Sequence, residues 1–209
     1  MSKNALTFLL FGIVLFLLVY SVWRISQPRP LSTGDMIANG FYPYGTNANE
    51  PVRDFRLIDY DGAEFTREDF QNKKLNFLYF GYTSCPTECP VMMSLMRQLY
   101  DKIETDEVAY YLVSFDPEID TLERLKAYVT GFNPEFMGLT GEIPEVVKLG
   151  QQLGVQKLAP MENHMNQRII THTNHLIVVN SDAEVLGIFR GPLESSAMAL
   201  VVKYLLTVN

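Results

Sequence analysis

The chain has 209 residues, with 17 lysines and arginines against 24 aspartates and glutamates, which gives a formal net charge of −7. The first 23 residues hold one lysine and no acid, so the remainder carries a net charge of −8. This acidic balance argues against nucleic acid as a partner, because nucleic-acid-binding proteins present a basic face. It is compatible with attraction of cations or of a basic protein surface, although a surface that is acidic only for solubility is the more common case.

The N-terminal segment predicts a membrane anchor. Ala5 to Trp23 is a run of 19 residues without a charge, and as a helix it would be about 28 Å long, enough to span the hydrocarbon core of a bilayer. The run is too long for a typical cleaved signal peptide, and no pair of small residues after it marks a cleavage site. We therefore expect residues 1–23 to form an uncleaved transmembrane helix.

The charges that flank this segment do not fix its orientation, because Lys3 precedes it and Arg24 and Arg29 follow it. A cysteine pair that can form a disulfide suits an oxidising compartment. On that ground we expect a single-pass protein of the inner (cytoplasmic) membrane, with its soluble domain in the periplasm or an equivalent space.

Residues 24–51 predict a linker, because they are rich in Pro, Gly, Asn and Ser and show no lasting periodicity. Residues 52–209 are the right size for one domain with a hydrophobic core. The expected elements of this domain are strands 54–58 and 64–65, strand 75–79, helix 91–103, strand 108–115, helix 121–129, strand 137–139, helix 144–153, strands 176–179 and 185–189, and helix 193–208. Strands that alternate with helices predict an α/β fold with a mostly parallel sheet, to which the closing hairpin adds an antiparallel edge. The order is that of a thioredoxin-like fold with an N-terminal β-hairpin extension.

The two cysteines of the chain, Cys85 and Cys89, directly follow the first buried strand in the segment FGYTSCPTECP, residues 80–90. On a helix, residues four apart share a face with their Cα atoms about 6 Å apart, which is within the range of a disulfide. The pair can therefore close a disulfide or hold one soft metal ion, and a helix N-terminus lowers the pKa of a thiol. Pro86 suits the start of a helix, while Pro90 suggests that the helix begins near residue 90.

Two plainer interpretations of the cysteines compete with a functional one. In the first, they are small buried apolar side chains, but both lie in one proline-flanked loop after a strand. In the second, they form a structural disulfide, but closing so short a loop contributes little stability. A site at the carboxyl end of a strand, where ligands bind in open α/β sheets, is the preferred interpretation.

Residues 80–90 resemble the signature of the Sco/SenC family, whose members are membrane-anchored, thioredoxin-fold copper-binding proteins of cytochrome c oxidase assembly. The segment VSFDPEIDT, residues 113–121, resembles the family's SVDPERDT segment. Asp54 to Gly62 resembles its leading hairpin, and His172, ten residues before Asp182, resembles the histidine of its DHS segment. The resemblance covers about residues 52–207.

The resemblance implies that Cys85 and Cys89 are two thiolate ligands of copper and that His172 is an imidazole ligand. The chemistry agrees, because thiolates with an imidazole suit Cu(I) and can also hold Cu(II). His175 is expected to face elsewhere. The family commonly has an acid before the ligand histidine, where this chain has Thr171, and such an acid would orient the imidazole. Asp116 and Asp120 match family acids, and Asp116 is explained equally well as a residue near the ligands or as an ordinary turn residue.

Two functions of different classes follow. The first is a copper metallochaperone that delivers copper to the copper-receiving subunit of cytochrome c oxidase. The second is a thiol–disulfide oxidoreductase, with Cys85 and Cys89 as its catalytic residues, that keeps the cysteines of that subunit reduced. A third hypothesis is a redox sensor. Other copper chaperones or thiol reductases are further expected partners. The three-residue spacing and the lack of a proline between Pro160 and Pro192 favour metal binding over general dithiol exchange.

The segment Met161 to Met165 contains two methionines and His164, all of which are soft ligands. One hypothesis is that this loop assists the entry or release of copper without setting the affinity. An ordinary loop without a function is the alternative.

Overall fold

The computed structural model describes residues 3–26, 29–44, 51–157, 161–162 and 168–208. It divides into two compact units, residues 1–31 and residues 32–209. The first unit contains helix α1 (Lys3–Ser26). The side chains described on this helix, among them Phe11, Phe16 and Val22, are mostly exposed. Among the described residues, no helix combines the length and apolar character that a membrane crossing requires.

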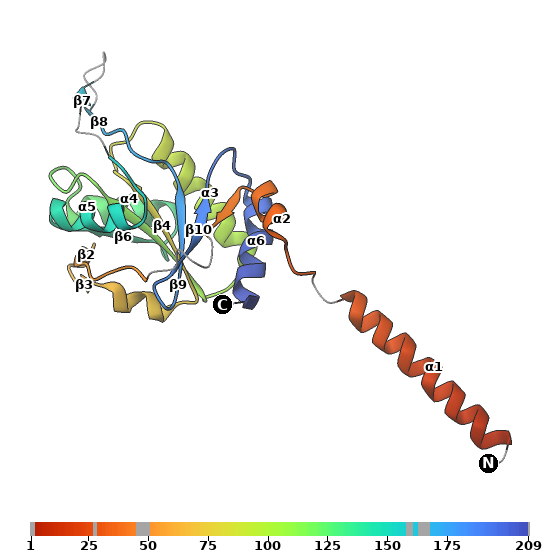
Figure 1. The fold of residues 1–209 in the computed structure, drawn as a ribbon. Helices are drawn as coiled ribbons and strands as arrows, with labels where there is room; N and C mark the ends of the chain where they lie inside the picture. Colours follow the sequence, from red (N-terminus) through yellow and green to blue (C-terminus); the bar gives the residue numbers. More distant parts are fainter. Residues whose placement is uncertain (1–2, 27–28, 45–50, 158–160, 163–167, 209) are drawn as a thin grey trace. The chain divides into compact units, whose positions relative to one another are not determined.

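The second unit is built on a sheet of eight strands in the order β1-β10-β9-β4-β5-β6-β2-β3 (Figure 1). Only the pairs β4–β5 and β5–β6 are parallel; the other five pairs are antiparallel. The prediction of a mostly parallel sheet was therefore wrong, because strands from both predicted hairpins extend the sheet, with β9 against β4 and β2 against β6. The strands are β1 (Phe41–Pro43), β2 (Leu57–Asp59), β3 (Glu64–Phe65), β4 (Leu75–Gly81), β5 (Val108–Ser114), β6 (Met137–Thr140), β9 (Leu176–Asn180) and β10 (Val185–Phe189).

Helices cover both faces of this sheet. On one face α3 packs against α6 and α4, and α5 and η1 lie on the other, where Val146 and Phe70 join one core cluster with Phe80. The helical elements are α2 (Thr33–Ala38), η1 (Arg67–Asn72), α3 (Glu88–Ile103), α4 (Leu122–Phe132), α5 (Ile143–Gln152) and α6 (Ser195–Val208). Strands β7 (Met161–Glu162) and β8 (Arg168–Ile169) pair with each other and project from the domain (Figure 1).

The alternation of side chains along β4 explains how this central strand serves both layers. Leu78 and Phe80 belong to the core cluster on the α5 face, while Phe77 stacks on Tyr110 and Tyr79 contacts Cys89 of α3 on the other. All seven residues of the strand are buried. The strand therefore ends, after Gly81, directly beneath the first turn of α3.

Two segments differ from the sequence prediction. The range 24–51, expected to be a linker, contains α2 and β1, and Phe41 of β1 is fully buried against Phe189. Helix α3 begins at Glu88 rather than at residue 91. A proline is accepted at position 90 because the first N–H groups of a helix have no partner within it. The predicted helices and strands of the domain otherwise lie within a few residues of their ranges, and Thr121 caps α4 as expected, whereas the short elements η1, β7 and β8 were not predicted.

Candidate functional site

The two cysteines lie where β4 passes into α3. Cys85 is half-buried in the turn before the helix, and Cys89 is fully buried in its first turn. Both are free thiols. The backbone N–H of Cys89 donates a hydrogen bond to the Cys85 sulfur at 3.4 Å. The predicted pair is therefore brought together at the carboxyl edge of the sheet.

Their environments separate the two thiols chemically. The Cys89 thiol donates a hydrogen bond to the Cys85 sulfur, and the backbone N–H groups of Cys89, Thr87 and Glu88 add to it, which lowers the pKa of Cys85 to about 5 despite its burial. The same hydrogen bond, together with burial, raises the pKa of Cys89. Cys85 is thus a thiolate at neutral pH and Cys89 a protonated thiol, as expected for a sulfur at a helix N-terminus and a partner behind it.

Tyrosine side chains enclose the sulfurs. The Tyr79 hydroxyl donates to the Cys89 sulfur at 3.7 Å, a long contact that is within reach for sulfur. Tyr82 is buried, and its hydroxyl accepts the backbone N–H of Ile170 at 3.1 Å. Burial is the main reason that the pKa of Tyr82 rises to about 12, and the negative charge of Cys85 adds to it. Neither tyrosine was predicted as a site residue, although both lie in the run of residues that leads to Cys85.

His172 packs against the same tyrosine rings. Its imidazole is 6.1 Å from the ring of Tyr79, 6.3 Å from that of Tyr82 and 5.6 Å from that of Phe115, measured between centroids. Its Nδ1 lies 3.0 Å from the carbonyl oxygen of Thr173, which can only accept, so Nδ1 donates there and Nε2 is the nitrogen left to serve as a ligand. The family pattern has an acid before this histidine, where this chain has Thr171. In this chain a backbone carbonyl orients the ring instead.

The three predicted ligands share one neighbourhood without forming a closed cluster. Over the residues that the structure describes, no group of three or more His, Cys, Asp or Glu side chains is close enough to hold a metal. His172 and Cys89 share Tyr79 as a neighbour, since the Tyr79 hydroxyl lies 3.7 Å from the Cys89 sulfur and its ring centroid 6.1 Å from that of His172. His175 lies near Arg190, and burial, together with the positive charge of Arg190, lowers its pKa. His164 and Met165 of the methionine loop lie outside the described residues, and Met161 is exposed in β7.

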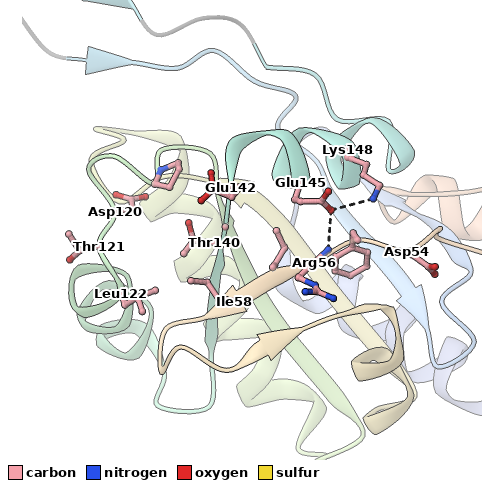
Figure 2. A pocket seen from close by; sticks show the side chains of 14 residues that line it. Asp54, Arg56, Ile58, Asp120, Thr121, Leu122, Thr140, Glu142, Glu145 and Lys148 are labelled. Atoms are coloured by element: carbon pink, nitrogen blue, oxygen red, sulfur yellow. Dashed lines mark hydrogen bonds and ion pairs between the residues drawn. The ribbon is translucent and has the colours of Figure 1, made fainter.

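A separate pocket of about 700 Å³ lies between β2, the end of β6 and the N-terminal ends of α4 and α5 (Figure 2). Glu145 accepts the backbone N–H of Arg56 there and pairs with Lys148 at 3.3 Å. Asp120 is part of the wall, whereas the described residues that line the pocket do not include the cysteines or His172. The pocket is therefore a neighbour of the site and not part of it.

The fold and the paired thiols define a thioredoxin-like domain with a dithiol at its helix N-terminus. The family described as SCO1/SenC matches residues 44–207, so the chain belongs to that family. The human mitochondrial protein SCO1 homolog is 31% identical over 139 residues, which is 65% of this chain and 46% of the human protein. The chain thus spans about half the length of that relative.

Two solved structures share the fold. The crystal structure of Arabidopsis thaliana ScoI with copper bound has a TM-score of 0.71 at 24% identity and covers 77% of this chain and all of that one. The structure of BsSco, described as a member of the Sco family of cytochrome c oxidase assembly proteins with a disulfide switch, has a TM-score of 0.60 at 22% identity and covers 77% of this chain and 96% of that one. Both confirm the predicted thioredoxin-like architecture.

The lowered pKa of Cys85 makes a prediction about its reactivity. In the reduced full-length chain, the rate of alkylation of Cys85 by iodoacetamide should rise with pH around a midpoint near 5, because the thiolate is the reactive form above that pH. Cys89→Ala removes the strongest stabilising hydrogen bond, so the midpoint should move upward. It should remain below the ordinary thiol value, because the backbone N–H groups persist. A wild-type midpoint near 8 or 9 would contradict this description of the site.

Proposed function

We propose that this chain is a copper metallochaperone of cytochrome c oxidase assembly. The observation that carries the proposal is the pair of free cysteines at the N-terminus of α3, with a histidine that packs on the adjoining tyrosine rings and whose Nδ1 faces a backbone carbonyl. Two sulfurs and one imidazole are a soft donor set that fits Cu(I) and can also hold Cu(II). The copper bound to the Arabidopsis relative and the description of BsSco support the same assignment.

In this proposal Cys85, Cys89 and His172 are the copper ligands, and copper is cargo. Cys85 is already deprotonated at neutral pH, so it binds the ion without losing a proton, while Cys89 must release one. Among the described residues these three side chains form no closed cluster, so the imidazole and the sulfurs must draw together to hold one ion. Three ligands leave a position at which a ligand of the copper-receiving oxidase subunit can attach.

The ligand set is tested by titrating the reduced full-length chain with copper. We expect about one copper per chain, and loss of tight binding in Cys85→Ala and in Cys89→Ala. In His172→Ala the copper affinity should fall by more than the ~10–100-fold that is typical when a residue beside the ligands, and not a ligand itself, is changed. The His172 variant should chiefly lose the Cu(II) form. His175→Ala is the matched control, because it removes a histidine three residues away that lies near Arg190. Unchanged affinity of His172→Ala for both oxidation states would remove His172 from the set.

Thiol–disulfide exchange is a second candidate function, favoured by the asymmetry of the two sulfurs. A half-exposed thiolate at Cys85 can attack a disulfide of a partner, and the buried thiol of Cys89 can then resolve the mixed disulfide. Cys89→Ala should trap such a mixed disulfide on Cys85 if this reaction occurs. If the wild-type chain binds copper stably and Cys89→Ala traps no mixed disulfide, thiol–disulfide exchange is excluded and the metallochaperone function remains.

We also propose that residues 5–23 anchor the protein in the inner membrane, with the domain in the periplasm or an equivalent space. The support is the run of 19 uncharged residues within one continuous helix, whose described apolar side chains are exposed. Exposed apolar surface of this extent typically marks a membrane or protein contact.

The anchor and its orientation are tested with a reporter fused after Asn209. A reporter that is active only after export should be active, and membrane extraction at high salt or high pH should leave the protein in the membrane fraction. Deletion of residues 1–23 is the control and should release the protein. Activity of a strictly cytoplasmic reporter at the same position would contradict the orientation.

A further inference from the structure

Asp120 is a buried acid whose carboxylate is fully engaged by the turn that precedes Cys85. The side chain is 1% exposed. Its Oδ2 accepts the backbone N–H of Thr83 at 3.0 Å and the hydroxyl of Ser114 at 2.6 Å, and its Oδ1 accepts the hydroxyl of Thr83 at 2.5 Å. Three donors thus converge on one carboxylate. Hydrogen bonds to an ionised acceptor are stronger than neutral ones.

The directions of these hydrogen bonds are fixed by their neighbours. The Thr83 hydroxyl accepts from Nε of Arg124 at 2.6 Å, so its own hydrogen is left for Asp120. The Ser114 hydroxyl likewise accepts the backbone N–H of Asp116 at 3.0 Å and donates to Asp120. An amide at position 120 would present an NH₂ group to one of these donors. The network therefore requires a carboxylate, not only a side chain of that shape.

The network connects the cysteine turn to the segment between β5 and α4. That segment also supports the histidine, because the ring of Phe115 packs on His172 and the Phe115 carbonyl accepts from Nζ of Lys157 at 3.3 Å. Residue 157 in turn forms a β-bridge with His172. One short segment, residues 115–120, thus contacts both parts of the site. The start of this segment contacts the histidine, and the end of this segment contacts the cysteine turn.

We propose that Asp120 is a positioning residue of the dithiol site. Its carboxylate holds Thr83, and through it the turn that places the Cys85 sulfur, at a fixed position relative to the end of β5 and to His172. It does not touch the copper ligands. Figure 2 shows the side chain at the wall of the neighbouring pocket, on the loop that leads into α4. The inference deepens the proposed function, because a fixed turn sets both the copper affinity and the ease with which Cys85 and Cys89 form a disulfide.

The test compares variants of the full-length chain in two measurements. The first is Cu(I) affinity by competition with a chelator, and the second is the dithiol–disulfide equilibrium of Cys85 and Cys89 against a reference dithiol. Asp120→Asn should weaken Cu(I) binding by about tenfold or more, as for other neighbours of metal ligands, and should shift the equilibrium constant in the second measurement. Thr83→Val should act in the same direction, and Thr83→Ser, which keeps the hydroxyl, should restore both values.

The controls separate positioning from a general loss of stability. Asp61→Asn removes an exposed acid that pairs with Lys126 of α4, and Thr130→Val removes a threonine hydroxyl of the same helix. Both should leave the two measurements unchanged. If Asp120→Asn does not fold, Thr83→Val and its rescue by Thr83→Ser decide the question.

Wild-type values of affinity and equilibrium in folded Asp120→Asn, or in Thr83→Val, would overturn the proposal. If the wild-type chain does not bind copper, the proposed function fails. The dithiol equilibrium still tests the role of Asp120 in that case.

Discussion

The site depends on one contact, the hydrogen bond from the backbone N–H of Cys89 to the sulfur of Cys85 at the N-terminus of α3. It exists because β4 ends under the first turn of the helix, so that the chain reverses within a few residues and leaves unpartnered N–H groups facing the Cys85 sulfur. The Cys89 thiol, and after it these N–H groups, stabilise negative charge on Cys85, so the half-buried sulfur is the thiolate and the fully buried one keeps the proton. The fold, more than the cysteines alone, makes the two thiols chemically different.

The position of His172 adds a second constraint. The imidazole contacts the rings of Tyr79 and Tyr82, which also adjoin the sulfurs, while the carbonyl of Thr173 accepts from its Nδ1 and leaves Nε2 as the nitrogen that can bind a metal. A dithiol in this state can be oxidised to a disulfide or can receive copper, and the imidazole completes the set only in the second case. In the proposed functions, metal binding and thiol exchange use the same sulfurs and differ in whether His172 takes part.

Much of this was predictable from the sequence. The spacing of Cys85 and Cys89 after an apolar run predicted that the two thiols meet at the end of a buried strand, as they do, and the alternation of strands and helices predicted the fold class. The parallel sheet was mispredicted, because periodicity identifies strands such as β9 but does not say which strand each will pair with. Strand β1 was missed because it has three residues and lies in a segment rich in turn formers. The tyrosine shell and the contacts of Asp120 join residues far apart in the chain, which no local pattern reveals.

The central claim is that one copper ion is held by two sulfurs and one imidazole of this chain. X-ray absorption spectroscopy of the reduced, copper-loaded full-length chain tests it most directly, because the first coordination shell distinguishes sulfur from nitrogen. The account predicts two sulfur and one imidazole nitrogen scatterers, with the nitrogen lost in His172→Ala. A shell of two sulfurs alone in the wild type, or one dominated by nitrogen and oxygen, would contradict it.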